Sequence, residues 1–367
     1  MLLALGFVAV GYMFSDQLLD NSPFEPDFNV ETLSVSPASA AAPRTLTLER
    51  TEAATRDGVF GLDTVSGHAV LGRIVSEDDE GVTRRVSEVQ GELGRGTESE
   101  VQTIVENGNP RQALDVPFAA IDYESDLGPM AAWYTPGKSK TWAIMVHGYK
   151  SNRRGLLRDY GVVRESGMPI LNVTYRNDPG NPPSPDGLIQ LGNQEWADVQ
   201  AAMQWALDHG AERFVMFGDS MGGAIVCTVY HRSDLADRID ALVLDSPVLD
   251  WGAVLDLQAS ERGLPDAVTV SAEEWIKARI GIDFAQFDQI SQASDFDVPI
   301  LLFHGDEDDI VPFETSEEFA EALPDRVTFY PAAGAGHVQA WNIGPRLYEQ
   351  RLRSFLDGLG LGPPASG

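Results

Sequence analysis

One serine stands in a setting that could make it a nucleophile. Ser220 lies in the segment 218–222, with the sequence GDSMG, which follows an apolar, strand-like run and precedes a helix-like one. A Gly-x-Ser-x-Gly pattern between a strand and a helix is typical of a sharp turn that presents a serine hydroxyl. The two glycines make room for this turn, because side chains there would collide with the neighbouring strand and helix. We therefore predict that Ser220 is a nucleophile.

A serine hydroxyl also needs a base and an orienting acid, because it is a poor nucleophile near neutral pH. Two later segments could supply them, each at the end of a predicted strand: residues 304–312 read HGDEDDIVP, and residues 334–337 read GAGH. Serine, acid and histidine in this chain order are expected when the nucleophile stands on a strand-to-helix turn. Asp245, at the end of an earlier strand, is an alternative acid.

The elements that must position these groups alternate between strand and helix patterns from residue 141 onward. The strand-like runs cover residues 141–146, 169–174, 213–217, 241–244 and 298–303. Helical spacing separates them, for instance over residues 196–207. Such alternation predicts a mostly parallel sheet with helices on both faces.

An insertion of about residues 248–293 separates the last two of these strands and is too long for a simple connection. Asp250 is a candidate N-cap for one helix within it. The Ser-x-x-Glu pattern at residues 271–274 predicts the start of a second helix. Two or three short helices with several aromatic residues would form a cap.

This cap should lie beside the nucleophile, because the insertion follows the strand that ends at Asp245. Ligands of open α/β sheets bind at the carboxyl ends of the strands. Trp251 and Trp275 are therefore candidate substrate-binding residues. Packing within the cap is the alternative role for both.

The chain begins with an apolar stretch, residues 1–14, that is shorter than the roughly 20 residues needed to span a bilayer. We interpret it as a hydrophobic membrane anchor or leader, with an ordinary core helix as the alternative. Residues 15–43, whose end is rich in Ser, Pro and Ala, predict a disordered linker. The protein is therefore expected to be membrane-associated or extracytoplasmic, with a cytoplasmic location as the alternative.

Between the linker and the main domain, residues 44–117 contain short strand-like runs separated by Gly, Asp and Asn. This pattern predicts a β-rich addition that extends the main sheet with antiparallel strands. It contains no catalytic motif, and its one histidine, His68, is expected to be structural or exposed. Residues 118–367 then form the main domain.

Composition excludes several classes of partner. The 367 residues include 56 Asp and Glu against 26 Lys and Arg, so the formal net charge is -30. Such a surface repels nucleic acid and anionic lipid headgroups. The single cysteine, Cys227, cannot form an intramolecular disulfide, and no Cys/His cluster or dense carboxylate set has metal-ligand spacing. We expect no metal and no cofactor.

Taken together, the motifs resemble those of the α/β-hydrolase superfamily. The chain is similar to bacterial serine hydrolases and esterases that share features with the dienelactone-hydrolase and prolyl-oligopeptidase branches. The motifs are HGY at 147–149, GDSMGG at 218–223, HGDEDDIVP at 304–312 and GAGH at 334–337, and the resemblance covers about residues 118–358. It implies an α/β-hydrolase fold with a helical cap and the β-rich N-terminal addition.

The resemblance also implies a role for each motif. Asp308, the fifth residue of HGDEDDIVP, corresponds to the acid of the catalytic triad, and His337 corresponds to its histidine. The backbone amides of Tyr149 and Met221 correspond to the oxyanion hole. In this arrangement His337 takes the proton from Ser220 and later protonates the leaving group, while Asp308 orients the imidazole.

The predicted activity is the cleavage of carboxylic esters, with a small-molecule ester as substrate, through an acyl-enzyme on Ser220. Peptidases, thioesterases and acyltransferases use the same triad and stay as alternatives, as does a non-catalytic binding protein of this fold. His147 and His304 stand in His-Gly turns and are expected to fix their loops rather than to transfer protons. The oligomeric state is left open.

Overall fold

The computed structural model describes residues 2–37 and 44–361. Within them the chain divides into two compact units. The first unit gathers the residues up to Pro23, Pro117–Ala340 and the residues from Glu349 onward. The second comprises Phe24–Val116 and Trp341–Tyr348. The predicted active-site residues all belong to the first unit.

The described part of the first unit is built on an eight-stranded sheet in the order β14-β13-β12-β11-β9-β10-β8-β7. Neighbours from β10 to β14 pair in parallel, and β7 and β8 add an antiparallel hairpin at one side. The strands are β7 (Ala119–Ser125), β8 (Gly128–Thr135), β9 (Thr141–Val146), β10 (Ile170–Val173), β11 (Arg213–Asp219), β12 (Ile239–Asp245), β13 (Ile300–Gly305) and β14 (Val327–Ala332).

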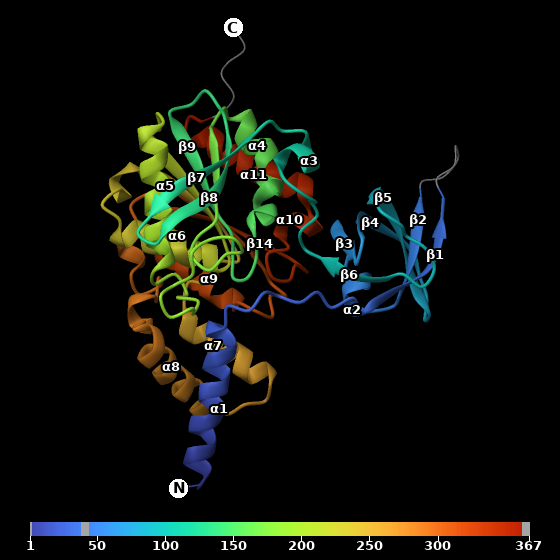
Figure 1. The fold of residues 1–367 in the computed structure, drawn as a ribbon, viewed down its shortest axis with the longest axis horizontal. Helices are drawn as coiled ribbons and strands as arrows, with labels where there is room; N and C mark the ends of the chain where they lie inside the picture. Colours follow the sequence, from blue (N-terminus) through green and yellow to red (C-terminus); the bar gives the residue numbers. More distant parts are fainter. Residues whose placement is uncertain (1, 38–43, 362–367) are drawn as a thin grey trace. The chain divides into compact units, whose positions relative to one another are not determined.

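Helices cover both faces of this sheet. The main ones are α4 (Tyr160–Glu165), α5 (Glu195–Asp208), α6 (Met221–Arg232), α9 (Phe313–Ala322) and α11 (Pro345–Gly358), and a short α10 (Ala340–Ile343) precedes α11. α5 and α6 lie on one side of the sheet, and α4 and α11 lie on the other (Figure 1). The predicted fold class, a mostly parallel sheet between helices, is confirmed.

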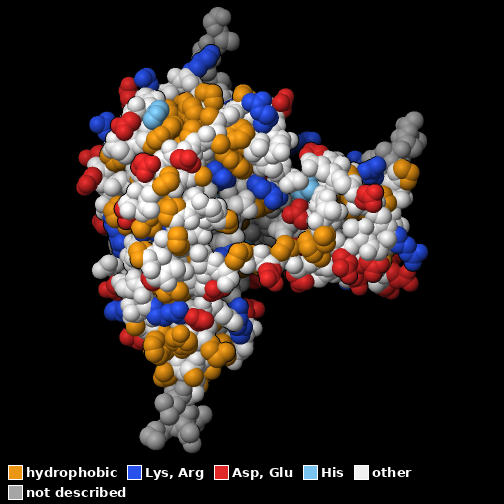
Figure 2. Space-filling model, viewed as in Figure 1, with side chains coloured by type: hydrophobic (Ala, Val, Ile, Leu, Met, Phe, Trp, Pro, Cys, Tyr) orange, Lys and Arg blue, Asp and Glu red, His pale blue; other side chains and the backbone are white. Residues whose placement is uncertain are grey.

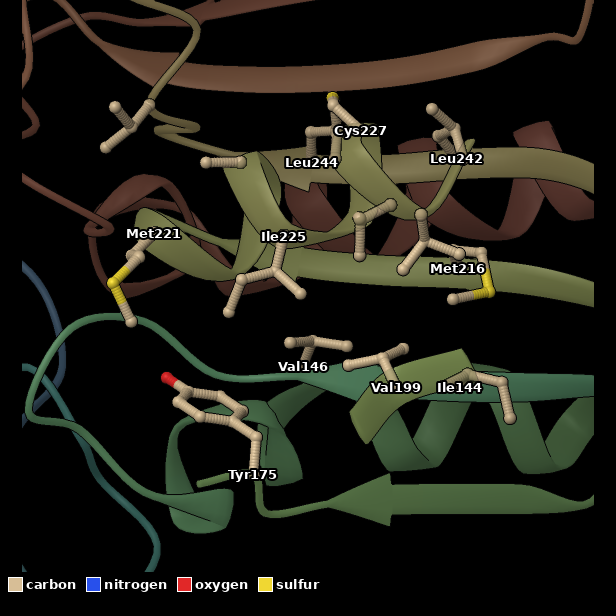
Figure 3. Packing of buried hydrophobic residues seen from close by; sticks show 14 of the residues in the cluster. Ile144, Val146, Tyr175, Val199, Met216, Met221, Ile225, Cys227, Leu242 and Leu244 are labelled. Atoms are coloured by element: carbon tan, nitrogen blue, oxygen red, sulfur yellow. The ribbon is translucent and has the colours of Figure 1, made fainter. Parts of the chain in front are cut away.

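The central strands are apolar along nearly their whole length because both of their faces are buried. Side chains of β9, β11 and β12 meet side chains of α5 and α6, as Figure 3 shows for Ile144, Val146, Met216, Leu242, Leu244, Val199 and Ile225. Removing an apolar side chain of this size from water is worth roughly 1.5–3 kcal/mol. This core fixes the strand ends that carry the predicted active-site residues.

The predicted cap is present between β12 and β13 as α7 (Trp251–Glu261) and α8 (Asp266–Ile280), followed by two short 3-10 turns. Asp250 caps α7 by accepting a 2.7 Å hydrogen bond from the amide of Gly252. The predicted start of the second helix at residues 271–274 is wrong, because α8 begins at Asp266, directly after Pro265. A proline at that point marks a helix start more strongly than a capping pattern inside the helix.

The apolar N-terminal stretch forms helix α1 (Leu2–Leu19), which lies beside α8 of the cap (Figure 1). Among the described residues, no helix combines the length and apolar character needed to cross a bilayer. The predicted boundary at residue 14 is wrong, since α1 continues to Leu19. Ser15 and Leu19, both assigned to the linker by composition, are fully buried.

The second unit contains a closed barrel in the strand order β1-β2-β5-β4-β3-β6. Its elements are β1 (Val30–Ser36), β2 (Thr45–Glu49), α2 (Glu52–Thr55), β3 (Phe60–Thr64), β4 (Gly67–Glu77), β5 (Gly81–Gln90), β6 (Glu98–Gln102) and α3 (Pro110–Leu114). Two predictions fail here. The strands close on one another instead of extending the main sheet, and β1 lies inside the predicted linker, while residues 38–43 of that linker fall outside the described residues.

A compact apolar core explains why this barrel forms. Leu46, Leu48 and Leu62 are fully buried inside it, and alternation along β1 buries Val30 and Thr32. Closure also leaves no exposed strand edge. His68 is buried and contacts Asp63 at 2.6 Å, in keeping with a structural role.

Candidate active site

The turn that carries Ser220 connects β11 to α6 and has a strained backbone. Ser220 has φ +54° and ψ −122°, outside the regions that L-residues favour. A Cβ atom on Gly222 would lie 2.2 Å from the carbonyl oxygen of Val146, and one on Gly218 would lie 2.6 Å from that of Gly222. Both glycines are therefore required by the close approach of backbone to backbone.

The structure brings Ser220, His337 and Asp308 together at the carboxyl edge of the sheet. His337 Nε2 lies 2.9 Å from Ser220 Oγ, and His337 Nδ1 lies 2.8 Å from Asp308 Oδ2. Nδ1–H donates to the carboxylate, so Nε2 is left to accept the hydroxyl proton of the serine. Asp308 follows β13 and His337 follows β14, so each side chain comes from a different strand end.

Asp308 is held by three hydrogen bonds and by a close contact with a second histidine. Its Oδ1 accepts from the amides of Ile310 and Val311, both at 2.9 Å. Its Oδ2 contacts His337, and also His304 Nε2 at 3.1 Å. Burial alone would raise the pKa of Asp308, but hydrogen bonds and charge attraction from the two histidines outweigh it and hold that pKa well below its ordinary value.

His304 is a contact of the acid that the sequence did not reveal. It is fully buried, its Nδ1 lies 2.7 Å from Ser316 Oγ, and its Nε2 lies 3.1 Å from the carbonyl oxygen of Val311. These contacts fix the loop, as expected of a His-Gly turn. The only sequence signal for the additional contact is the four-residue spacing between His304 and Asp308. Such a spacing does not by itself predict that two side chains meet.

The low pKa of Asp308 makes its contribution to stability depend on pH. The unfolded-state pKa of aspartate is about 3.9 and the folded-state value is lower, so this contribution is complete above about pH 5 and is lost as the pH falls through the folded-state pKa. We expect Asp308→Asn to lower the free energy of unfolding at pH 6, with the difference from the parent shrinking at about pH 3. Urea unfolding at both pH values checks this, and a difference that grows on acidification would contradict it.

The alternative acid, Asp245, has a different partner. Its Oδ2 lies 3.0 Å from the guanidinium of Arg158, which also contacts Asp219 at 2.9 Å. All three side chains are buried. Burial raises the pKa of Asp219 and of Asp245, and attraction to Arg158 opposes that rise. His337 therefore pairs with Asp308, whereas Asp245 pairs with the buried arginine.

Arg158 connects the segments that carry the serine and the histidine. Asp219 directly precedes Ser220, and Arg158 Nη1 donates to the carbonyl oxygen of Val338, directly after His337, at 3.2 Å. The arginine itself lies in a 3-10 turn, residues 153–159, outside every motif of the sequence. Its position in the fold, rather than its neighbours in the chain, makes it part of the site.

Removing this buried cation is expected to be costly. Arg158→Met leaves Asp219 and Asp245 buried without their cation, so we expect a loss of about 3–5 kcal/mol in the free energy of unfolding. Arg353, which pairs with Glu165 at an exposed position, is the matched control, and Arg353→Met should cost less than about 1 kcal/mol. Denaturant unfolding of both variants measures the two losses in free energy of unfolding. Equal losses would show that the buried Arg158 contributes no more to stability than an exposed arginine in an ion pair.

The two predicted oxyanion donors come from different segments of the chain. Met221 is the first residue of α6, and the first amides of a helix have no carbonyl acceptor within it. Tyr149 lies in the loop that follows β9. The residue before it, Gly148, approaches the nucleophile so closely that a Cβ atom there would lie 2.9 Å from Ser220 Cβ.

The peptide between Gly148 and Tyr149 is held in a fixed orientation. Tyr175 donates its hydroxyl to the Gly148 carbonyl oxygen at 3.0 Å, and His147 Nδ1 lies 3.0 Å from the same oxygen. The other ring nitrogen of His147 contacts Asp178 at 2.8 Å. Because the peptide is trans, its N–H points away from its carbonyl. The predicted loop-fixing role of His147 thus acts on the peptide that carries the Tyr149 amide.

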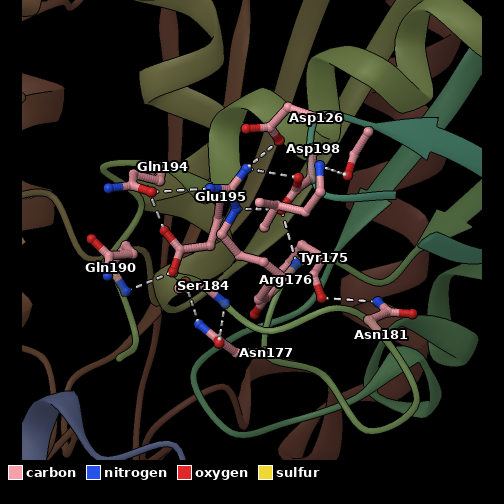
Figure 4. Close-up of polar contacts among 12 residues, drawn as sticks. Asp126, Tyr175, Arg176, Asn177, Asn181, Ser184, Gln190, Gln194, Glu195 and Asp198 are labelled. Atoms are coloured by element: carbon pink, nitrogen blue, oxygen red, sulfur yellow. Dashed lines mark hydrogen bonds and ion pairs between the residues drawn. The ribbon is translucent and has the colours of Figure 1, made fainter. Parts of the chain in front are cut away.

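A buried polar network holds the loop between β10 and α5 that supplies Asp178 (Figure 4). Arg176 Nε contacts Asp198 at 2.8 Å, and Arg176 Nη2 contacts Asp126 at 2.9 Å. Further hydrogen bonds in this network involve Gln190, Gln194 and Glu195. No sequence pattern predicts this network, because its members are spread over more than seventy residues.

The two cap tryptophans have different surroundings. Trp251 is buried and donates its Nε1–H to the carbonyl oxygen of Leu191, in the loop between β10 and α5, at 3.0 Å. Trp275 donates to the carbonyl oxygen of Val8 in α1 at 3.2 Å and packs edge-to-face on Tyr12. A substrate-binding role stays a prediction for both tryptophans. The contacts of Trp275 with Val8 and Tyr12 show that its indole packs on α1.

Comparison with known proteins agrees with this fold. Residues 186–351 match the prolyl oligopeptidase family, and residues 33–102 match a domain of unknown function, DUF8805. An esterase of Pyrococcus furiosus, Pf2001, superposes with a TM-score of 0.55 at 19% sequence identity, over 70% of this chain and 95% of that one. The chain is therefore an α/β hydrolase in its fold, as its motifs predicted.

Two kinds of relative share sequence with the main domain. An uncharacterized protein of Mycobacterium tuberculosis is 26% identical over 235 residues, which cover 62% of this chain and 74% of that protein. The acylamino-acid-releasing enzyme of Sus scrofa is 26% identical over 243 residues, which cover 60% of this chain but only 32% of the enzyme. The similarity to that enzyme is confined to a third of its length.

Proposed function

We propose that this protein is a serine hydrolase that cleaves carboxylic esters through an acyl-enzyme on Ser220. The observation that supports the proposal is the hydrogen-bonded series Ser220, His337 and Asp308, with distances of 2.9 and 2.8 Å. Nucleophile, base and orienting acid within hydrogen-bond reach are the arrangement that this chemistry requires.

The reaction follows from the roles of these groups. His337 Nε2 accepts the proton of Ser220 as Oγ attacks the ester carbonyl carbon, and Asp308 stabilises the imidazolium that forms. The amides of Tyr149 and Met221 donate to the oxyanion. The imidazolium then protonates the leaving alcohol as its bond to the acyl carbon breaks. Water then attacks the acyl carbon and gives a proton to His337 Nε2. The bond between the acyl carbon and Ser220 Oγ breaks as Oγ takes that proton, which releases the acid product and restores Ser220.

A peptidase is the second candidate. The match of residues 186–351 to the prolyl oligopeptidase family, and the similarity to an acylamino-acid-releasing enzyme, favour it. The fold neighbour described above, Pf2001, is an esterase among many structures of this fold, and esters need less leaving-group activation than amides, so we place small esters first. Attachment to a membrane through residues 1–14 stays a prediction.

A substrate panel tests the proposal. Initial rates are measured for p-nitrophenyl esters of increasing acyl length, a thioester, and an N-acetyl-alanine p-nitroanilide, with Ser220→Ala as the blank. We expect the short esters to give the highest kcat/KM. A higher kcat/KM for the anilide would make the protein a peptidase, and rates equal to the blank for every substrate would make it non-catalytic.

The same panel separates the two cap tryptophans. Trp251→Phe replaces an indole that donates to the loop between β10 and α5, the loop that also carries Asp178, the partner of His147, so we expect it to change the ranking of esters by acyl length. Trp275→Phe should leave the ranking unchanged, because its contacts are with α1. Unchanged rankings in both variants would assign Trp251 to packing alone.

A further inference from the structure

Helix α1 is tightly docked on the cap. Beyond the contacts of Trp275, Arg279 of α8 forms a 2.9 Å ion pair with Asp16. The two helix backbones are so close at Gly11 that a Cβ atom there would lie 2.5 Å from Ser271 Oγ and 2.6 Å from Ser271 Cβ. Only glycine fits this crossing without moving one helix.

The opposite side of α1 is open. Hydrophobic side chains gather over α1 and α8 at the lower end of the view in Figure 2. Met13 is 64% exposed and Val8 is 45% exposed. The helix is therefore held from one side, so its position depends on the contacts with α8 and on its C-terminal end.

That C-terminal end binds the loop that carries a predicted oxyanion donor. The Tyr149 hydroxyl donates to the carbonyl oxygen of Leu18 at 3.0 Å and to that of Gln17 at 3.2 Å. These carbonyls belong to the last turn of α1, and the last carbonyls of a helix have no amide donor within the helix. The neighbouring residue, Lys150, forms an ion pair with Asp20 at 3.4 Å. Two successive residues of the loop are thus attached to α1.

The chemistry of the tyrosine suits this attachment. Burial raises the pKa of Tyr149, and the nearby charge of Asp20 raises it further. The phenol therefore keeps its proton and stays a donor. Helix carbonyls at a C-terminus carry partial negative charge, which strengthens a hydrogen bond donated to them.

The Tyr149 amide is consequently fixed from two directions. Tyr175 and His147 hold the carbonyl side of the preceding peptide, and α1 holds the side chain that follows the amide. Oxyanion donors act only when they are already in place, since a donor that must reorganise stabilises the transition state less.

We propose that α1 is a positioning element of the oxyanion hole: its C-terminal carbonyls hold Tyr149, and its docking on α8 makes turnover depend on the seating of the helix. The inference rests on the proposed esterase function. We assign no contact with the reacting atoms to α1 or to the Tyr149 side chain. Both act only by fixing the position of the Tyr149 amide.

Two glycines of α1 give a matched test. Gly11→Leu forces α1 away from α8, whereas Gly6→Leu introduces the same side chain where nothing lies within 4 Å of the new Cβ. Tyr149→Phe removes only the hydroxyl. The double variant Gly11→Leu/Tyr149→Phe completes a double-mutant cycle, which measures whether the two substitutions act through the same contact. Active enzyme is titrated with a phosphonate so that kcat refers to folded sites. Hydrogen exchange of residues 147–152 is followed by mass spectrometry as a readout that needs no turnover.

We expect Gly11→Leu and Tyr149→Phe each to lower kcat by about tenfold, a part of the 10²–10³ that loss of a whole donor costs. KM should change little, because the oxyanion contact is made in the transition state. The double variant should fall no further than either single one, and Gly11→Leu alone should speed exchange over residues 147–152.

The outcomes separate the inference from the function on which it rests. Parental kcat and exchange in Gly11→Leu, or additive losses in the double variant, overturn the inference. A parent that hydrolyses no ester, combined with faster exchange in Gly11→Leu, overturns the proposed function and leaves the hold of α1 on the loop supported. If Gly11→Leu does not fold, parental kcat in Tyr149→Phe still overturns the inference.

Discussion

Ser220→Ala is expected to lower kcat for ester hydrolysis by about 10⁶-fold while the protein folds as before. The reason is that Oγ is the only atom lost, and it is the atom that forms the acyl-enzyme. Alanine meets the same backbone strain at φ +54° as serine does, so the turn itself should be kept. The oxyanion amides remain and should leave a small residual rate over water.

The measurement is a comparison of kcat for p-nitrophenyl acetate in the parent, Ser220→Ala and Ser260→Ala. Ser260 is an exposed serine of the cap and serves as the control. Thermal unfolding of all three establishes that folding is unchanged. Turnover in Ser220→Ala at the rate of the control would remove the serine from the mechanism.

Asp308→Asn is expected to have the second largest effect, a fall in kcat of about 10⁴-fold. A carboxylate only accepts hydrogen bonds, whereas an asparagine amide can present its NH2 group to His337 Nδ1, so the imidazole is no longer held in the tautomer whose Nε2 accepts the serine proton. Asp245→Asn should reduce kcat much less, because Asp245 contacts Arg158 and not His337.

The two asparagine variants are compared at one pH with the same ester, with the fraction of active enzyme determined in each. A larger loss in Asp245→Asn than in Asp308→Asn would move the acid to the end of β12. Because kcat is referred to the active fraction of each variant, a difference in stability between the two variants does not produce the predicted ranking.

Much of the main domain could be predicted because its signals are local. The strands are continuous apolar runs. Glycine at 218 is dictated by a contact within the nucleophile turn, and glycine at 222 by the carbonyl oxygen of Val146 at the end of β9. The catalytic motifs lie directly after strands, so the topology of a parallel sheet brings them to one edge. The helical cap follows from the length of the connection between two strands.

The residues that could not be predicted act over long distances in the chain. Arg158 contacts residues 61 and 87 positions away, and nothing in its own segment marks it. The same holds for the network of Arg176, which is formed by charged side chains that composition alone places on the surface. Burial of a charge is decided by the partners that the fold supplies.

The N-terminal stretch shows where average composition does not predict element bounds or packing. An apolar run followed by Ser, Pro and Ala resembles an anchor and a tether, yet the run is helix α1 and packs on α8. Its docking depends on Gly11 meeting Ser271, a contact between residues 260 positions apart. Average composition conceals β1, because this seven-residue alternating strand lies inside a segment that is otherwise rich in Ser, Pro and Ala.

The central claim, that Ser220 is an activated nucleophile, is tested most directly by labelling. The parent is incubated with a fluorophosphonate, digested, and the modified peptide is identified by mass spectrometry. We expect a single phosphonylated residue, Ser220, with labelling reduced strongly in Asp308→Asn and abolished in Ser220→Ala. A parent that stays unlabelled, or that is labelled equally well in Ser220→Ala, would contradict the account.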